Sequence, residues 1–450
     1  MFIPHTEVEK DAMLKSIGVK DIKDLFTDVP EKYRFPKLNL PPGVTELEVM
    51  TELSEYAAAN ELVGDMACFL GAGAYHHYIP AVVDSLLRRG EFYTAYTPYQ
   101  PEISQGTLQA VFEFQTLIAN LTGMEVCNAS HYDGATATAE AGVMAYHHFR
   151  GKRKKILLSP AIHPHYREVL CSYLCGFEDI EISSGTLQAD LSDQPDDLIK
   201  QVDDQTALVV VQYPDFFGRI QDFSNLVSSA HQTGALIAFV TNPTALGVLK
   251  TPGELGADIV VGEGQPLGIP LSYGGPYLGY FATRKEYVRK LAGRLVGETS
   301  DALGRRGYVL TLTAREQHIR REKATSNICS NQGLMALAAT IYMSLVGKHG
   351  MRQVAELCYQ KAHYAASEIA KLSGFKVITR EPFFHEFVVK CPTAVNDINH
   401  ELLDMGFIGG YDLGSSYSEM QDNMLVAVTE MNTKEDIDAF VAALQEVTND

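Results

Sequence analysis

The chain has 450 residues, of which 46% are hydrophobic and 21% charged. This balance is typical of a globular protein and excludes wholesale disorder. Lys and Arg number 37 and Asp and Glu number 56, so the net charge is −19. Because so acidic a surface repels nucleic-acid phosphates and anionic lipid, we expect no nucleic-acid or membrane partner. No run of 18 apolar residues and no basic or apolar leader are present, so we expect a cytoplasmic protein.

The first part of the chain, residues 1–65, is expected to be an arm of helical and extended segments. Thr45–Asn60 is predicted to be a helix, because apolar residues recur every three positions from Leu47 to Tyr56. A second helix is predicted over Gly106–Gly123, where the closing glycine is typical of a helix C-terminus.

The middle of the chain alternates apolar runs with helical patterns. The predicted strands are Ile156–Leu158, Ile180–Ile182, Leu208–Gln212, Leu236–Val240, Ile259–Val261 and Leu278–Ala282. The predicted helices between them are 135–150, 164–175, 193–202 and 222–233. Continuous Val, Ile and Leu strands at this spacing predict an α/β fold with a mostly parallel sheet that is covered on both faces.

After residue 330 the pattern changes to long helices with fewer strands. Helices are predicted at 333–346, 351–373, 394–405 and 433–447, and strands at 375–379, 385–390 and 424–428. We therefore expect a large α/β domain over 66–330 and a smaller C-terminal α+β domain over 331–450.

Two glycine-containing segments resemble phosphate-binding loops. Gly71–Gly73 lacks the Lys and hydroxyl residue of a P-loop, so a tight turn with close backbone approach is the more plausible use of its glycines. Asp133–Glu140 opens a helix with small hydroxyl residues, which suits a phosphate. Helix capping by Asp133 explains the same pattern, and the local sequence favours capping.

A cationic segment, Arg315–Lys323, leads into the small polar stretch Ala324–Cys329. A solvated helix face is one interpretation and an anion site at the domain junction is the other, and the local sequence leaves both open. No nucleophile motif and no metal-ligand spacing occur, so we expect no metal site.

The order and content of several motifs are similar to those of a known family. The chain resembles the glycine cleavage system P-protein, glycine dehydrogenase (decarboxylating), and specifically the N-terminal half of its long form. The resemblance therefore points to the alpha subunit of the two-chain form. The matching segments are Phe69–Tyr75, Tyr96–Gly106, Tyr213–Gly218, Ser272–Pro276 and Arg315–Cys329.

The resemblance implies a fold-type I pyridoxal-phosphate enzyme. In this family glycine is decarboxylated on pyridoxal 5'-phosphate, CO2 is released, and the aminomethyl group passes to the lipoyl group of H-protein. The implied partners are glycine dehydrogenase subunit 2 (the beta chain) and lipoylated H-protein, with the T- and L-proteins as functional partners. An α2β2 assembly is the implied oligomeric state.

Two positions depart from what the family's chemistry requires. The Schiff-base lysine is expected after the strand that ends near Val261, where this chain has Gln265. The acid that keeps the pyridine nitrogen protonated is expected after the preceding strand, where this chain has Asn242. An amide cannot form an imine and a neutral Asn cannot hold a pyridinium, so the cofactor is expected mainly on the partner subunit.

The resemblance also implies candidates for a site shared across the interface. Thr325, Ser326 and Asn327 occupy the place from which one subunit reaches its neighbour's cofactor phosphate. Tyr96 and Tyr99 are expected to orient glycine or line the route of the lipoyl arm, with packing as the alternative. The remaining candidates are Arg315, His318, Arg320, Arg321 and Lys323.

Two other functions stay open at this stage. The chain could be a self-sufficient pyridoxal-phosphate enzyme that uses an unforeseen lysine, such as Lys250 or Lys285. It could also be a purely structural or regulatory subunit.

Overall fold

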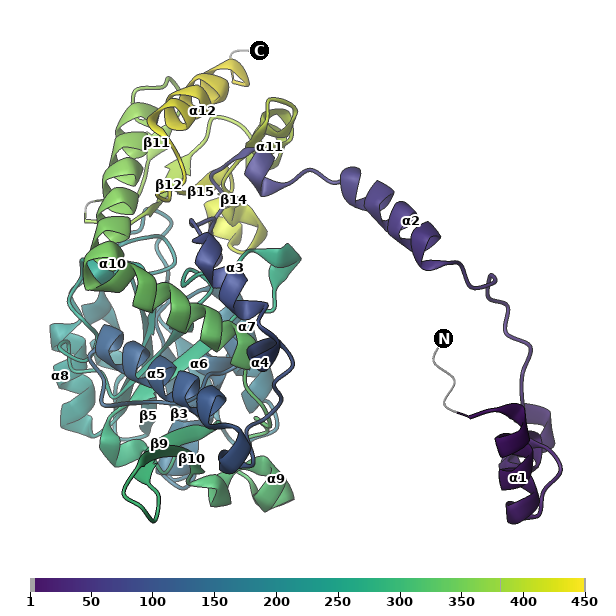
Figure 1. Cartoon of the computed structure of the whole chain (residues 1–450). Coiled ribbons are helices and arrows are strands. Elements are labelled where there is room, and N and C mark those ends of the chain that lie inside the picture. The colour runs from purple at the N-terminus through teal and green to yellow at the C-terminus, as the bar shows by residue number, and fades with distance from the viewer. Residues whose placement is uncertain (1–4, 381, 449–450) are drawn as a thin grey trace. The chain divides into compact units, whose positions relative to one another are not determined.

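The computed structural model describes residues 5–380 and 382–448, which group into two compact units that divide after Glu61 (Figure 1). The first unit contains helices α1 (Glu7–Ile17) and α2 (Glu46–Ala58). Among the described residues, no helix combines the length and the apolar character needed to cross a bilayer.

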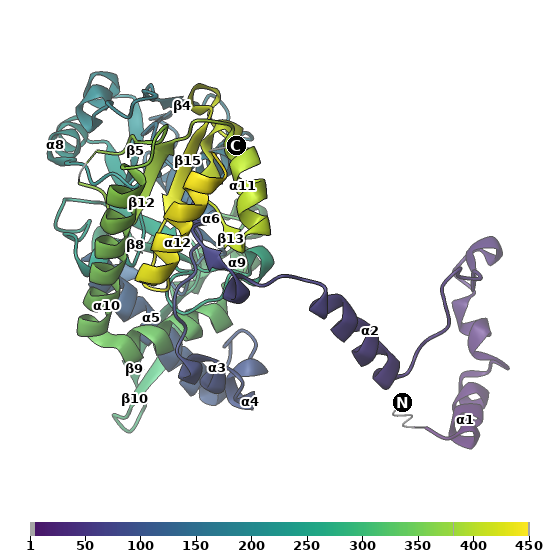
Figure 2. The same ribbon diagram turned by 90° about the horizontal axis from the view of Figure 1, so that it is seen from above.

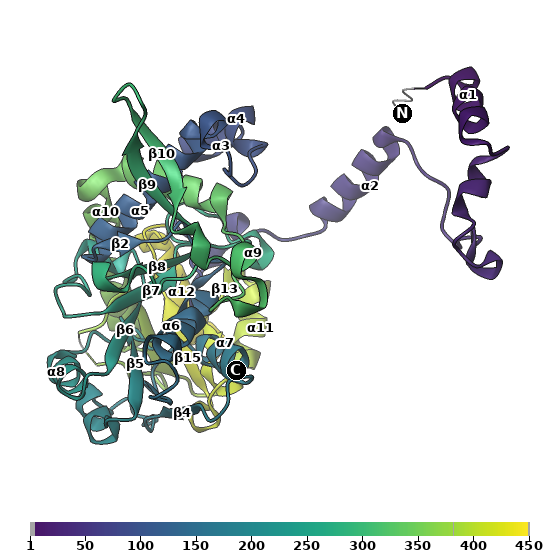
Figure 3. The same ribbon diagram turned by 90° about the horizontal axis from the view of Figure 1, so that it is seen from below.

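The second unit is built on a seven-stranded sheet with the strand order β2-β8-β7-β6-β5-β3-β4 (Figure 3). The strands from β7 to β4 run parallel, whereas β8 pairs antiparallel with both β7 and β2. The bounds are β2 Val126–Cys127, β3 Lys155–Leu158, β4 Glu181–Ser184, β5 Thr206–Tyr213, β6 Leu236–Thr241, β7 Ile259–Glu263 and β8 Gly279–Thr283. The prediction of a mostly parallel sheet is confirmed. The segment between β7 and β8 has no α-helix, the usual crossover between parallel strands.

Helices cover both faces of this sheet. Alternate residues of each buried strand point to opposite faces: Val209 and Val211 of β5 belong to one core, Leu208 and Val210 to the other. The first core includes side chains of α5, α8 and α10, and the second includes side chains of α6 and α7. Their bounds are α5 Gln105–Thr122, α6 Gly134–His148, α7 Pro164–Leu174, α8 Ser224–Thr233 and α10 Gly333–Ile369. The helix predicted over 193–202 is a 3-10 helix, Pro195–Gln201.

The C-terminal region forms a four-stranded antiparallel sheet in the order β11-β12-β15-β14, with α10, α11 and α12 packed around it (Figure 2). Its elements are β11 Lys376–Val377, β12 Glu386–Lys390, β14 Tyr411–Asp412, β15 Asn423–Ala427, α11 Val395–Asp404 and α12 Lys434–Glu446. Helix α10 is interrupted at Gly347, which has φ +60°, between the two helices predicted from the sequence. A short parallel pair joins β1 (Ala67–Cys68) to β13 (Phe407–Ile408). The expected domain division at residues 330/331 stays a prediction.

A hairpin that the sequence analysis missed lies beside the large sheet. Strands β9 (Leu295–Ser300) and β10 (Arg306–Thr311) pair antiparallel. Figure 3 shows this hairpin near the short helices α3 (Ala81–Leu87) and α4 (Gly90–Tyr93). Side-chain amides of α5 anchor it: Gln115 exchanges two hydrogen bonds with the backbone of Val296, and Gln105 does the same with Tyr308. A further short helix is α9 (Gln317–Arg320).

Candidate active site

Gln265 lies just after β7 and is held by the backbone on all sides. Its side chain is 1% exposed. Its amide nitrogen donates to the carbonyls of Tyr75 (2.9 Å) and Ile269 (2.8 Å), and its amide oxygen accepts from the Tyr75 N–H (2.8 Å). Because both ends of the amide are paired, Gln265 acts as a structural link between β7 and the segment around Tyr75.

Asn242 follows β6 and faces a neutral partner. Its oxygen accepts from the Thr244 N–H at 2.9 Å, and its nitrogen lies 3.0 Å from Nε2 of His385. Burial lowers the pKa of His385 to about 3, so this imidazole is uncharged at neutral pH. Neither side chain supplies the negative charge that a pyridinium needs.

The space beside Asn242 is nearly filled. A cavity of about 30 Å³ remains between Asn242 and Glu263, whereas ligand pockets usually measure about 300–1,000 Å³. Gln265 does not line this cavity and instead borders a separate one of about 300 Å³ near Tyr78 and Leu271. The Gly71–Gly73 turn is held by two buried side chains, since Glu386 accepts from the Ala72 N–H (2.7 Å) and His163 donates to the Ala72 carbonyl (2.8 Å). The residues present here therefore do not fit pyridoxal phosphate.

The glycines of this turn allow the close backbone approach that the sequence predicts. A Cβ on Gly71 would lie 2.5 Å from the Cβ of Ala427, and Gly73 has φ +108°. A side chain at either position would therefore clash or strain the backbone.

The start of α6 is also occupied by this chain's own carboxyl groups. Asp133 caps the helix by accepting from the Thr136 N–H at 2.7 Å, and Glu263 accepts from the Gly134 N–H at 2.9 Å. Burial raises the pKa of Glu263 to about 8. The capping interpretation is thus confirmed for Asp133, and the N–H groups of Gly134 and Thr136 already have carboxylate partners.

We expect Glu386→Gln to flatten the pH dependence of stability. Burial raises the pKa of Glu386 from its ordinary value of 4.5 to about 7. Between these two values the folded chain holds one more proton than the unfolded chain, so its stability falls as pH rises from 4.5 to 7. The variant should remove about 1.4 kcal/mol per pH unit from that slope, measured by urea unfolding at pH 5, 6 and 7. Parallel slopes in variant and wild type would contradict the assignment.

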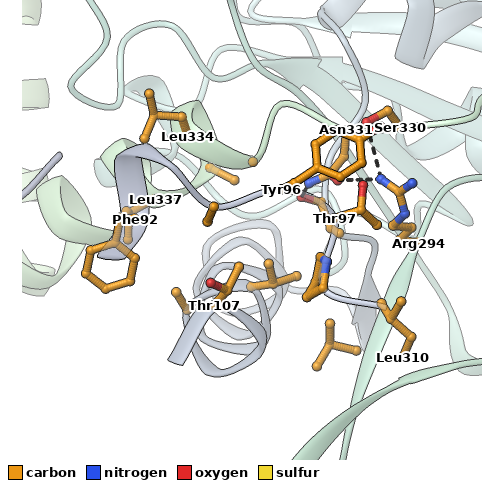
Figure 4. A pocket seen from close by; sticks show the side chains of 18 of the residues that line it. Phe92, Tyr96, Thr97, Thr107, Arg294, Leu310, Ser330, Asn331, Leu334 and Leu337 are labelled. Atoms are coloured by element: carbon orange, nitrogen blue, oxygen red, sulfur yellow. Dashed lines mark hydrogen bonds between the residues drawn. The ribbon is translucent and has the colours of Figure 1, made fainter. Parts of the chain in front are cut away.

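A second candidate site is a cavity that lies away from Gln265 and shares no lining residue with the cavity beside Asn242 (Figure 4). It measures about 240 Å³ and is lined by Tyr96, Thr97, Arg294, Ser330 and Asn331 together with apolar side chains. The ring of Tyr96 is 86% exposed. This cavity therefore opens where Tyr96 meets the segment that precedes α10.

Arg294 joins the segment that contains Tyr99 to the stretch before α10. The sequence analysis did not identify this residue. Its guanidinium is 3% exposed and donates to the Cys329 carbonyl (2.8 Å) and the Asn331 side chain (3.1 Å). It also donates to the Tyr99 hydroxyl at 3.4 Å, and it lies 3.9 Å from Glu316. A single Arg inside the apolar run around Leu295 is the only local signal that could have indicated it.

The structure brings some of the other candidates together and leaves others apart. His318 packs edge-on against Tyr99, with ring centroids 5.7 Å apart. Arg315 is half-buried and donates to the Leu291 carbonyl, and Arg320 donates to Ala314 at 3.2 Å. Arg321 and Lys323 are exposed. The segment is a series of single helical turns around the four-residue helix α9, so of the two interpretations left open, that of one solvated helix face is wrong.

The polar stretch before α10 divides into an inward and an outward part. Ser326 donates to Glu140 at 2.7 Å and accepts from the Ile328 N–H at 3.0 Å. Glu140 is 1% exposed, and burial raises its pKa to about 7. Thr325 and Asn327 are exposed on either side. Ser326 therefore anchors the stretch, and its two neighbours face solvent.

Three possible metal ligands gather elsewhere, within 4.8 Å of one another: His77, Cys358 and Glu430. Nδ1 of His77 lies 2.7 Å from Glu430, and the Cys358 thiol donates to the same carboxylate oxygen at 3.4 Å. Burial raises the pKa of the Cys358 thiol well above its usual range. These contacts account for the cluster as a buried hydrogen-bond network.

The seven-stranded sheet followed by a small antiparallel sheet defines the class of protein: the chain has the fold-type I architecture of pyridoxal-phosphate-dependent enzymes. A solved glutamate decarboxylase from Lactobacillus brevis shares this fold, with a TM-score of 0.70 at 16% identity over 93% of this chain and 96% of that chain.

Closer similarities show the family. The model of the Glycine cleavage system P-protein family matches residues 1–444, and the chain belongs to that family. A protein of Thermomicrobium roseum named "Probable glycine dehydrogenase (decarboxylating) subunit 1" is 55% identical over the full length of both chains. A protein of the same name from Geobacillus kaustophilus is 53% identical over 98% of each. A crystal structure of a glycine decarboxylase (P-protein) in inhibitor-bound form has a TM-score of 0.92 at 43% identity, covering 99% of this chain and 100% of that one. The name "subunit 1" implies a second subunit.

Proposed function

We propose that this chain is the alpha subunit of a two-chain glycine decarboxylase and contributes to a site on its partner, subunit 2. The observation that carries the proposal is the buried Gln265, whose amide is fully paired where the fold-type I lysine would stand. Pyridoxal phosphate is held by the partner, where it supplies the electron sink for decarboxylation of glycine. The aminomethyl group then passes to the lipoyl group of H-protein.

This chain's contribution to the partner's site comes from the second cavity and from the neighbouring segment Arg315–Cys329. Thr325 and Asn327 offer a hydroxyl and an amide to the partner's cofactor phosphate, and Arg320, Arg321 and Lys323 add positive potential nearby. Tyr96, Tyr99 and His318 line the approach for glycine or the lipoyl arm, while Arg294 positions Tyr99 against the stretch before α10. Arg315 donates to the carbonyl of Leu291, three residues before Arg294. The α2β2 state, the T- and L-proteins as functional partners and the cytoplasmic location stay predictions.

Borohydride reduction of the assembled enzyme tests the proposal, because it fixes the cofactor to the lysine that holds it. We expect peptide mapping to find the label on subunit 2 alone, and this chain by itself to show no glycine–CO2 exchange. Label on Lys250, Lys285 or any other peptide of this chain would contradict the proposal and favour a self-sufficient enzyme.

The double variant Thr325→Val/Ser326→Ala should weaken cofactor retention by the assembled enzyme about tenfold. It removes two hydroxyls, one that faces solvent and one that anchors the stretch to Glu140, and a hydrogen bond to a charged group is worth about 1.5–3 kcal/mol. The measurement is cofactor loss during dialysis. Ser228→Ala on the exposed side of α8 is the matched control. Unchanged retention would leave a purely structural role for the stretch, as in the alternative of a structural or regulatory subunit.

A further inference from the structure

The carboxyl group of Glu263, at the end of β7, is held by three separate segments of the chain. Its Oε2 accepts from the Gly134 N–H at the start of α6 (2.9 Å). Its Oε1 accepts from the N–H groups of Gln265 (3.0 Å) and Leu278 (2.9 Å). All three donors are backbone groups, and Glu263 is only 8% exposed. Backbone N–H groups that converge at a helix N-terminus are a common means of binding phosphate in proteins.

A glycine at the start of α6 allows this convergence. A Cβ on Gly134 would lie 2.9 Å from the backbone nitrogen of Glu263 and 2.3 Å from the hydroxyl of Tyr166. A side chain at this position would therefore push the end of β7 away from the helix. Helix α6 has 15 residues, so the positive end of its dipole also faces the carboxyl group.

The hydroxyl groups that would suit a phosphate are bonded within the helix instead. Thr136 donates to the carbonyl of Asp133 at 3.0 Å, and Thr138 donates to the carbonyl of Gly134 at 2.8 Å. The side chains of Asp133 and Glu263 place two carboxyl groups at the helix start, whereas a phosphate would bring a charge of about −1.5 to −2. The chain thus supplies acceptors and acidic groups of the kind that a bound phosphate would supply.

We infer that the carboxyl group of Glu263 stands in for a phosphate and keeps phosphate-bearing ligands off this chain. Gln265 and Asn242 remove the chemistry of the cofactor, whereas Glu263 occupies both the backbone donors and the space. Its side chain borders the cavity of about 30 Å³, so truncation of this side chain would enlarge that cavity. The alternative is a structural link between three segments. A link requires the carboxyl group itself, whereas phosphate can replace a stand-in.

Equilibrium dialysis of the full chain against inorganic phosphate, at constant ionic strength, tests the inference. Glu263→Ala leaves three buried N–H groups without an acceptor, so we expect it to bind phosphate about tenfold or more tightly than the wild type. Phosphate should also raise the urea midpoint of this variant alone. Glu263→Gln is the matched control, because it has the same size, fills the same space and should bind no phosphate. Equal affinity in the wild type and Glu263→Ala, or in the two variants, would overturn the inference.

A second variant keeps the test decisive if Glu263→Ala folds poorly. Asp133→Ser/Glu263→Ala removes both carboxyl groups but retains a capping residue, so it should bind phosphate at least as tightly as the single variant. For a variant that does not fold in phosphate-free buffer, the refolding yield with added phosphate is measured instead, and phosphate-dependent refolding would support the inference. Two variants that stay unfolded with phosphate would overturn it, since the carboxyl group would then be a link that phosphate cannot replace. These results concern this chain alone, so the inference can fail while the borohydride label still supports the proposed function.

Discussion

Gln265→Lys is expected to destabilise the chain by about 2–4 kcal/mol without restoring cofactor binding. A lysine has donors but no acceptor, so the Tyr75 N–H would lose its partner at 2.8 Å. The ammonium would also replace a side chain that is only 1% exposed. Asn242 would still supply no charge to a pyridinium.

Urea unfolding and visible absorbance with added pyridoxal phosphate check this result on the same sample. Gln265→Met is the matched variant, because it has a similar size, loses all the hydrogen bonds of the amide and adds no charge. We expect its loss of stability to be smaller than that of the lysine variant. A stable lysine variant that acquires cofactor absorbance would show that the site is open and needs only an amine.

Arg294→Met should lower the stability of the chain by about 2–4 kcal/mol, because the buried Cys329 carbonyl and Asn331 side chain lose their donor and Glu316 loses one of its cationic neighbours. It should also lower kcat of the assembled enzyme by about a hundredfold, since Tyr99 and the stretch before α10 would lose their common anchor. Arg294→Lys keeps the charge but cannot reach both segments, so we expect an intermediate loss.

The control for Arg294 is Arg306→Met, whose side chain is exposed at the start of β10, and which should change neither quantity appreciably. Unfolding free energies of the chain and steady-state kinetics of the complex separate the two effects. If Arg294→Met lowered stability alone and left kcat unchanged, Arg294 would be a packing residue with no part in the shared site.

Local patterns in the sequence were sufficient for much of the fold. The buried strands β3, β5, β6 and β7 contain continuous apolar runs, and the break in α10 falls at Gly347, between the two predicted helices. Helix period and strand period depend on neighbours a few residues apart, which is why such elements can be read from one sequence. The hairpin of β9 and β10 was missed although its two strands are neighbours in the sequence, and its anchoring by Gln105 and Gln115 of a distant helix is visible only in the tertiary structure.

The chemistry at Gln265 and Asn242 was also determined by the sequence, because an amide lacks the amine and the charge whatever surrounds it. Only the tertiary structure decided which distant residues these buried polar side chains contact. Gln265 binds Tyr75, 190 residues earlier, and Ser326 binds Glu140, 186 residues earlier. Arg294 pairs with Tyr99, again far along the chain. Each buried polar group needs a hydrogen-bond partner, and that partner is whichever polar group the fold brings within reach. Because such groups can be far apart in the sequence, local patterns do not identify them.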